Sequence, residues 1–252
     1  MAYPYIIWAF VMIVAPMMLI LLYAFTTKGN DVLTFQFSFG NFLRFFSDDV
    51  FPQVLLRSLK MAFVTTLFCI LIGYPCAYFI AKMKPNSQGV MILLITLPMW
   101  INVLVRTYAW RGLLGYFDLS SELKVYIGMV YNFLPFMILP IYTVLIKMDT
   151  DLINAASDLG ASRKEIFTKI IFPLSMPGII SGITMVFMPA VSTFVISRIL
   201  GGGQYMLLGN LIETQYTSMD DWNFGSAIAI FMMIIILISM AFMNKFEGTD
   251  DK

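Results

Sequence analysis

Six long apolar stretches dominate the pattern of hydrophobic and polar positions along the chain. Each holds about 20 predominantly apolar residues, the length that an α-helix needs to cross the hydrocarbon core of a bilayer. They cover residues 5–25, 61–81, 90–110, 125–146, 177–197 and 224–243. The first carries no charge, is long for the core of a signal peptide and lacks a small-residue cleavage site, so we expect it to remain as a spanning helix.

The connections between these stretches differ in character. Residues 26–60 form a long loop whose phenylalanine-rich run, 35–46, predicts an interfacial amphipathic helix, and residues 82–89 predict a tight polar turn. Residues 111–124, 147–176 and 198–223 form the other three connections. Prolines inside the apolar stretches predict either broken, kinked helices that line a cavity or simple curvature. These prolines are Pro75, Pro98, Pro135, Pro140 and Pro189.

Composition agrees with a chain that lies largely in lipid. Of its 252 residues 60% are hydrophobic and 12% are charged, and the mean hydropathy is +0.83. A soluble domain is nearer half apolar and a quarter charged, and a soluble fold of this length lacks the interior to hide so much apolar surface. We therefore predict an all-α membrane protein with six transmembrane helices, forming one domain over residues 1–252.

Charge and reactive side chains exclude several classes of function. A net charge of +1 without a clustered basic face gives no case for a nucleic-acid partner. The absence of histidine removes the commonest general base and metal ligand, so we expect neither a catalytic nor a metal site. Cys69 and Cys76 lie on one predicted helix about 10 Å apart, too far for a disulfide. Lysine and arginine are equally numerous in the segments predicted on the two sides of the membrane, so charge alone does not orient the chain.

The connection 147–176 carries strong local signals. Asp149 or Thr150 can cap a short helix, and Gly160 stands where a helix needs a left-handed residue to end. Ser162 then opens a second helix, with Glu165 completing a capping box, and Pro173 is expected to end it. The first helix places four apolar side chains on one face, namely Leu152, Ile153, Ala156 and Leu159. A helical loop that merely rests on the lipid headgroups is the alternative interpretation.

The spacing in this connection resembles the cytoplasmic loop of binding-protein-dependent, type I ABC-importer permeases. That motif reads Glu-Ala-Ala, three residues, Gly, nine residues, Ile-x-Leu-Pro. The matching positions here are Asn154, Ala155, Ala156, Gly160, Ile170, Phe172 and Pro173. The spacing fits throughout, whereas Asn154 replaces the usual glutamate and Phe172 the usual leucine.

A wider resemblance, from about residue 55 to 240, is to the polyamine permeases of this family. It rests on Ile72-Gly73-Tyr74-Pro75, Leu97-Pro98-Met99-Trp100, Arg106-Thr107-Tyr108, Asn132-Phe133-Leu134-Pro135, Gly209-Asn210 and Asp221-Trp222-Asn223-Phe224-Gly225. The connection around residues 117–122 is shorter than this resemblance leads us to expect.

The resemblance implies a location and a set of partners. The chain would lie in a bacterial inner membrane with both termini in the cytoplasm, beside a second permease subunit and below an extracytoplasmic substrate-binding protein. Because the sequence has no G-x-x-x-x-G-K-[ST] loop, ATP would be bound by a separate cytoplasmic ABC ATPase dimer, and this chain would need no cofactor. The residues implied in contact with that ATPase are Asp151, Leu152, Asn154, Ala155, Ala156, Asp158, Leu159, Gly160 and Pro173.

The implied substrate is a polyamine such as spermidine or putrescine, a polycation that carboxylates and aromatic faces would attract. Candidate pathway residues are Trp100, Tyr108, Trp110, Glu213, Asp221 and Trp222. The other carboxylates on the same side are Asp118, Glu122 and Asp220. The alternative interpretation is that these aromatic side chains form the interfacial belt and the carboxylates are solvated.

Other functions remain open at this point. A permease of the same family could carry an inorganic ion or an amino acid instead. A secondary transporter would need ionisable residues at membrane depth, a channel would need a selectivity filter, and a membrane enzyme would need clustered catalytic groups. The centres of the six stretches carry no acidic residue, which argues against a tight cation site within the membrane.

Overall fold

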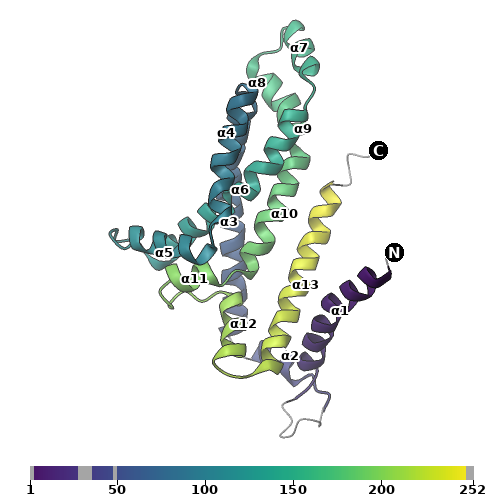
Figure 1. Ribbon diagram of the computed structural model, residues 1–252, viewed down its shortest axis with the longest axis vertical. Helices are drawn as coiled ribbons and strands as arrows, with labels where there is room; N and C mark the ends of the chain where they lie inside the picture. Colours follow the sequence, from purple (N-terminus) through teal and green to yellow (C-terminus); the bar gives the residue numbers. More distant parts are fainter. Residues whose placement is uncertain (1–2, 28–35, 48–49, 248–252) are drawn as a thin grey trace.

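The computed structural model describes residues 3–27, 36–47 and 50–247, with side chains described within 8–27, 36–47 and 50–243. These residues form α-helices with short 3₁₀ and π turns and contain no strand, only an isolated antiparallel bridge between Thr26 and Phe37 (Figure 1). The all-α prediction is therefore confirmed.

The helices follow one another through the whole described chain. Their bounds are α1 Tyr3–Ala24, α2 Gly40–Ser47, α3 Val50–Ala81, α4 Pro85–Thr96, η1 Leu97–Trp100, α5 Val103–Leu114, α6 Ser121–Lys147 and α7 Thr150–Asp158. They continue with α8 Arg163–Ile166, η2 Phe167–Ile171, α9 Phe172–Leu174, α10 Met176–Ser192, α11 Val195–Leu200, α12 Leu208–Thr217 and α13 Trp222–Glu247.

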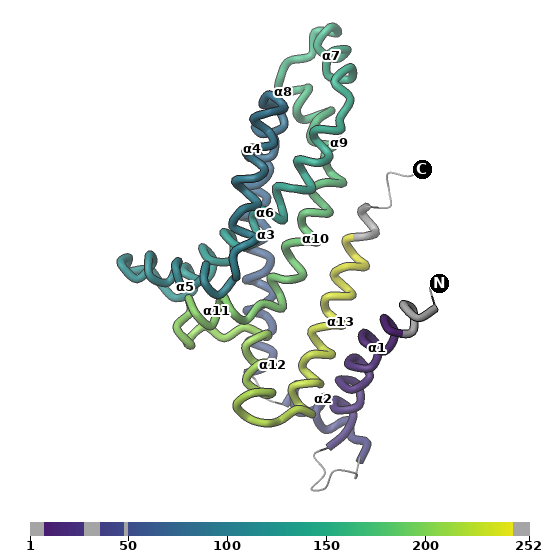
Figure 2. Tube along the Cα trace, in the orientation of Figure 1, coloured from purple at the N-terminus to yellow at the C-terminus, as the bar shows by residue number. Residues whose placement is uncertain are grey.

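A bundle of α3, α6 and α10 forms the centre of the molecule, with α4 beside it (Figure 1). The loop that carries α7 caps one end of this bundle, and α2 and α12 lie toward the opposite end. Helices α1 and α13 run side by side and diverge from the bundle toward the termini, as the tube in Figure 2 makes plain. Helix α5 leaves the bundle sideways.

Small residues allow the central helices to approach closely. A Cβ atom added to Gly178 of α10 would lie 2.9 Å from the carbonyl oxygen of Pro140 and 3.0 Å from the Cα of Ile141, both in α6. The side chain of Met137, which is fully buried, fills the space beside Gly73 and Gly182. Because lipid provides little hydrophobic force between spanning helices, such close backbone packing is a main source of their association.

Length and composition qualify three helices as membrane spans: Val50–Ala81, Ser121–Lys147 and Trp222–Met243. Two bent pairs pass the same test together, α4 to η1 with α5, and α8 to α9 with α10, which raises the number to five. The described apolar part of α1, Trp8–Ala24, is shorter. The count of six therefore stays a prediction.

Two predicted stretches are broken rather than continuous. Within 90–110, the direction of the chain turns by 95° after η1. Ile101 is extended there, and the side chain of Asn102 accepts a hydrogen bond from the Leu104 amide at 2.8 Å, which starts α5 as a new helix. Within 177–197, α10 ends at Ser192 and α11 begins at Val195. The expectation of proline-marked breaks holds here, since Pro98 lies in η1 and Pro189 in the last turn of α10.

The predicted connections also contain more helix than expected. Residues 50–60 extend α3 instead of belonging to a loop, and α4 begins at Pro85, inside the predicted polar turn. The helix predicted in 35–46 is present only in its second part, as α2 from Gly40 to Ser47, since residues 36–39 are not helical and residue 35 lies outside the described residues. Helix α12 lies inside the predicted loop 198–223. Its short apolar face, Leu208 and Leu211, is too brief to stand out as a periodic pattern.

We predict that Gly178→Ala lowers the free energy of unfolding by about 1–3 kcal/mol, because the added methyl group overpacks the α6–α10 contact. Thermal unfolding of the purified protein in detergent measures this loss. Gly89→Ala in α4 is the matched control, since a Cβ there meets no described atom within 4 Å. The control should stabilise slightly through helix propensity, and equal effects of the two changes would contradict the packing account.

Candidate functional site

Helix α7 begins and ends with well-formed caps. At its start, the Asp149 carboxylate accepts a hydrogen bond from the Asp151 amide at 2.9 Å. At its end, the Ala161 amide bonds the Ala156 carbonyl and the Gly160 amide bonds the Ser157 carbonyl, the two hydrogen bonds of a Schellman motif. Gly160 has φ +83°, a left-handed conformation that costs glycine nothing. The predicted cap and helix stop are both confirmed.

The capping box predicted at Ser162 is present. The Glu165 amide donates to the Ser162 hydroxyl at 3.3 Å, and the Ser162 amide donates to the Glu165 carboxylate at 3.0 Å. Lys169 adds an ion pair to Glu165 at 3.2 Å, one turn further along. The backbone and side-chain hydrogen bonds from Ser162, followed by Lys169, lower the pKa of Glu165 to about 2. The carboxylate is therefore charged, and the box intact, throughout the physiological pH range.

Helix α7 is largely exposed, with Ile153 and Ala156 half-buried. No residue of α7 is buried in the described chain, and the side chains of Leu152 and Leu159 are 49% and 89% exposed. A hollow of about 290 Å³ lies against the adjoining turn, lined by Leu159, Gly160, Ala161, Glu165, Ile166, Lys169 and Ile170. Exposed leucines on a capped helix at the tip of a molecule are typical of a surface that a partner covers.

The second half of the loop leads directly into the bundle. The residues Phe167–Ile171 form a π-helical segment, and Pro173 lies inside the following short helix, α9. The prediction that Pro173 ends the helix is therefore wrong. The wider π turn accommodates the proline that an α-helix would reject. The break comes instead at Ser175, where the axis bends by 56° into α10.

Tyr74 of helix α3 packs against the break at Ser175. The hydroxyl groups of Tyr74 and Ser175 are 3.0 Å apart and share a hydrogen bond, with both side chains buried. The Tyr74 ring packs against Phe167 and Phe172 at centroid distances of 6.0 and 5.7 Å. Ser175 also donates to the Phe172 carbonyl at 2.8 Å. These contacts join the second half of the loop to α3 at the point where α10 begins.

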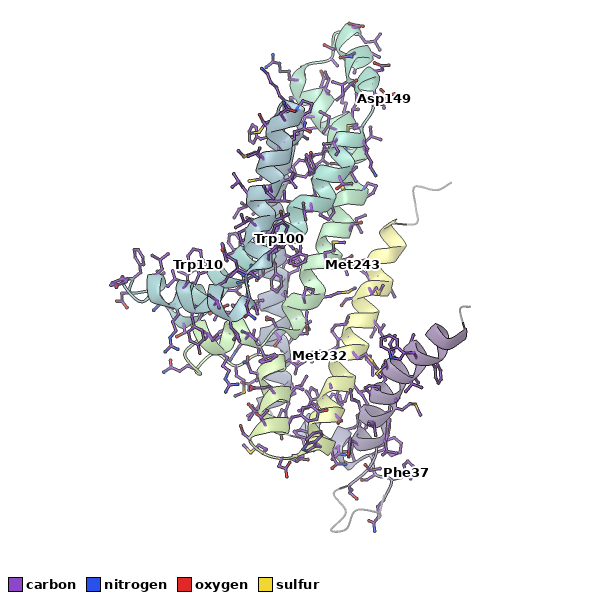
Figure 3. The ribbon with its side chains drawn as sticks, in the orientation of Figure 1. Phe37, Trp100, Trp110, Asp149, Met232 and Met243 are labelled. Atoms are coloured by element: carbon purple, nitrogen blue, oxygen red, sulfur yellow. The ribbon has the colours of Figure 1, made fainter. Side chains whose placement is uncertain are left out.

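The predicted pathway residues do not converge on one site. Trp100 ends η1 and is 76% exposed, and Tyr108 is also exposed. Trp110 packs edge-on against Tyr131 of α6 at 5.1 Å. Figure 3 places Trp100 and Trp110 near the point where α5 leaves the bundle, far from Asp149. The remaining three, Glu213, Asp221 and Trp222, lie on α12, before α13 and at the start of α13.

Three of the candidate carboxylates are paired with cations of the chain itself. Asp221 forms an ion pair with Arg44 of α2 at 2.9 Å, and Glu213 pairs with Arg198 of α11. Glu122 accepts hydrogen bonds from Lys60 of α3 and from the Tyr205 hydroxyl, each at 3.2 Å. Each pair joins two segments of the chain. The charge of each of these three carboxylates is therefore already neutralised by an arginine or a lysine of the chain.

Trp222 and Asn223 contact the C-terminal end of α1. The Trp222 ring lies 6.1 Å from Tyr23 and 5.3 Å from Tyr216. Next to it, Asn223 donates to the carbonyl groups of Tyr23 and Thr26, each at 2.9 Å. Asn41 of α2 donates to the carbonyls of Ala24 and Thr26 at 3.0 and 2.9 Å. The two asparagines satisfy the carbonyl groups that α1 leaves open at its C-terminal end.

Asn210 is a residue that sequence reasoning missed. Its amide donates to the Phe194 carbonyl at 2.8 Å, and its oxygen accepts from Ser197 at 2.6 Å and from the Leu207 amide at 3.1 Å. The side chain thereby joins the start of α11, at Phe194 and Ser197, to the start of α12, at Leu207. The signal in the sequence was the pair Gly209-Asn210, in which Gly209 lets α12 approach the Ser192 carbonyl closely.

Comparison with known proteins places this arrangement in a family. The family described as "Binding-protein-dependent transport system inner membrane component" matches residues 1–247. The spermidine/putrescine transport system permease protein PotB of Haemophilus influenzae is 34% identical over 250 residues, covering 92% of this chain and 87% of that protein. PotB of Escherichia coli is 35% identical over 248 residues, covering 91% and 90%.

Solved structures share the fold. A bacterial ABC transporter involved in the import of the acidic polysaccharide alginate matches with a TM-score of 0.69 at 15% identity, over 99% of this chain and 94% of that one. The MetNI methionine ABC transporter matches with a TM-score of 0.62 at 15% identity, over 78% and 94%. The chain belongs to the inner-membrane permease components of binding-protein-dependent ABC importers.

Proposed function

We propose that this chain is the permease subunit of an ATP-driven importer of polyamines, of the spermidine and putrescine class. It forms half of the translocation pathway and is coupled to a separate ATPase through residues 149–173. The observation that carries this proposal is the identity of 34% and 35% to two PotB permeases over more than nine-tenths of the chain. The exposed, capped helix α7 supports the coupling role.

The coupling follows from the geometry of the loop. Leu152, Ala156 and Leu159 provide an apolar face that a groove on an ATPase can bury, as amphipathic helices bind in grooves generally. Gly160 makes the tight turn into α8, and the hydrogen bond between Tyr74 and Ser175 ties the far end of the loop to α3. Closure of an ATPase dimer would then move α7 to α10 together against the bundle.

This coupling sets the orientation and the partners. With α7 in the cytoplasm, both termini are cytoplasmic, and the end that carries α2 and α12 faces outward. The proposed assembly holds a PotA-like ATPase dimer, which binds ATP in place of any cofactor on this chain, and a PotC-like second permease. A PotD-like binding protein delivers the substrate from outside.

The pathway is proposed to pass the substrate rather than to store it. The carboxylates of Glu122, Glu213 and Asp221 already neutralise Lys60, Arg198 and Arg44, so this half of the outer end offers a polycation little net attraction. Affinity for the polyamine would then reside in the binding protein. Trp100, Tyr108 and Trp110 remain the candidates for aromatic contact with a passing ammonium group.

Uptake of labelled spermidine into proteoliposomes that hold the complete importer tests the transport claim. We expect uptake only with ATP inside and the binding protein outside, and inhibition by excess unlabelled putrescine. Excess amino acid or inorganic cation serves as the control for specificity. Uptake that proceeds equally without ATP would reject ATP-driven import. Inhibition by an amino acid but not by putrescine would reject a polyamine as the substrate.

Substitutions at Gly160 distinguish the effect of the backbone conformation from the effect of side-chain volume. Since a Cβ at Gly160 meets no described atom within 4 Å, the chain itself leaves room for a side chain there, and the constraint within the chain is the positive φ. Asparagine tolerates this region, whereas a β-branched residue does not. We expect Gly160→Val to abolish ATP-dependent uptake and Gly160→Asn to retain much of it, with equal amounts of both variants in the membrane. Equal activity of the two variants would contradict the required turn.

A charge placed on the apolar face of α7 tests docking. We expect Ala156→Asp to abolish substrate-stimulated ATP hydrolysis by the purified complex, because a carboxylate would be buried against the ATPase without a partner. Ser87→Asp is the matched control, since it adds the same charge in the exposed first turn of α4, where the helix dipole favours it. Normal stimulation of the Ala156→Asp complex would reject docking through this face.

A further inference from the structure

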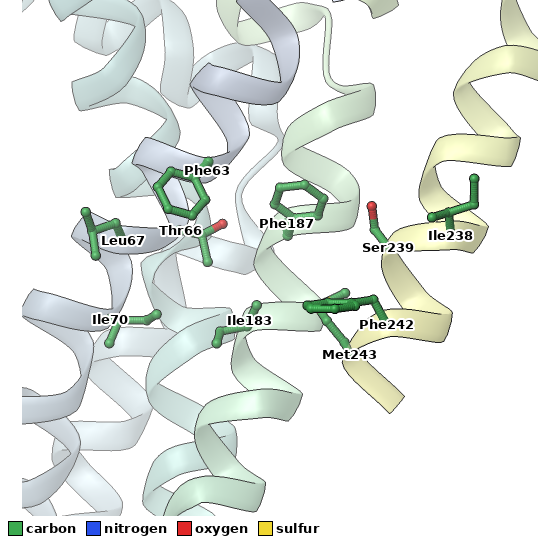
Figure 4. A pocket seen from close by; sticks show the side chains of 10 residues that line it. All are labelled: Phe63, Thr66, Leu67, Ile70, Ile183, Phe187, Ile238, Ser239, Phe242 and Met243. Carbon is green, nitrogen blue, oxygen red and sulfur yellow. The ribbon is translucent and has the colours of Figure 1, made fainter. Parts of the chain in front are cut away.

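An apolar groove runs between α3, α10 and α13, on the side where α13 diverges from the bundle (Figure 4). Its volume is about 440 Å³. Ile183 and Phe187 of α10 lie between the two other helices, with Phe63 and Leu67 of α3 on one side and Phe242 of α13 on the other. Near Met243, the Thr184 hydroxyl contacts the methionine sulfur at 3.6 Å, which joins α10 to α13.

The lining of this groove presents hydrocarbon almost alone. It contains two hydroxyl groups, and both are satisfied within their own helices. Thr66 donates to the Ala62 carbonyl and Ser239 donates to the Ile235 carbonyl, each at 2.8 Å. With no charged residue in the lining, an occupant gains from apolar contact and finds no hydrogen bond to make.

The size and position of the groove indicate its occupant. Helices α3 and α13 both qualify as membrane spans, so the groove lies at the depth of the bilayer's hydrocarbon. A helix is about 10 Å wide and rises about 5.4 Å per turn, so each turn fills roughly 400 Å³. The groove therefore holds little more than one helical turn, whereas an unbranched acyl chain is far thinner and can lie along much of it.

We propose that the groove between α3, α10 and α13 is a binding site for one acyl chain of a membrane phospholipid. The chain lies against Ile183 and Phe187, with Phe63 and Phe242 on its two sides. It fills the space left by the divergence of α13, and it contacts α10, the helix that continues directly from the loop 149–173. The lipid thus occupies a fixed place beside the helix through which the loop is joined to the bundle.

The test uses the assembled importer in vesicles of phosphatidylethanolamine and phosphatidylglycerol, with a trace of phosphatidylethanolamine that carries a photoactivatable diazirine in one acyl chain. After illumination, mass spectrometry of peptides locates the adducts. We expect several-fold more label on Phe63, Phe187 and Phe242 than on Leu71 and Phe79, which are 59% and 65% exposed on α3 and lie outside the groove. Equal label on both sets would overturn the proposal, since every lipid-facing residue would then be alike.

A pair of variants tests whether the adducts form inside the groove. Ile183→Trp fills the floor of the groove and should remove most label from Phe63 and Phe242, whereas Leu71→Trp makes a comparable change outside it and should not. Persistence of the label in the Ile183→Trp protein would contradict the site.

A benzoylphenylalanine at position 187 identifies the occupant directly in the otherwise unaltered importer. An adduct with the mass of a phospholipid supports the proposal. An adduct with a peptide of the second permease subunit would replace the lipid by a protein contact and overturn it.

Discussion

A bilayer supplies no hydrogen bonds, so every backbone group that a break in a helix leaves open must find a partner within the chain. In the described part of this molecule, asparagine side chains supply many of these partners. Asn102 starts α5 after the 95° turn, Asn210 joins the start of α11 to the start of α12, and Asn41 with Asn223 closes the end of α1. Of the two bent spans, the first bends beside Asn102 and the second beside Ser175, whose hydroxyl bonds the Phe172 carbonyl.

The two ends of the molecule satisfy their polar groups in different ways. At the end of α2 and α12, charges and amides bind segments of the chain to one another, as in the pairs of Arg44 with Asp221 and Arg198 with Glu213. At the other end, α7 satisfies its own backbone through Asp149 and the Gly160 turn, and packs none of its side chains into the core. A helix that needs nothing from its own chain, yet presents leucines to water, is suited to bind a partner.

Local signals in the sequence predicted the loop 147–176 well because caps depend on a few neighbouring residues. Asp149, Gly160, Ser162 and Glu165 each act within four positions of their partners. The failures concern partners distant in the chain. Pro173 is predicted to end a helix, but after the π turn the chain stays helical to Leu174 and breaks at Ser175, whose contact with Tyr74 is 101 positions away. The pairing of Asp221 with Arg44 spans 177 positions and leaves no local pattern.

The central claim is that α7 binds a separate ATPase, and amide hydrogen exchange across residues 150–160 measures this most directly. In the permease alone, this short helix, which has no buried residue, should exchange rapidly, because local opening costs it little free energy. The account predicts strong protection of these amides when the ATPase is added, with the α12 amides unchanged. Protection confined to other cytoplasmic segments, with residues 150–160 exchanging as before, would contradict it.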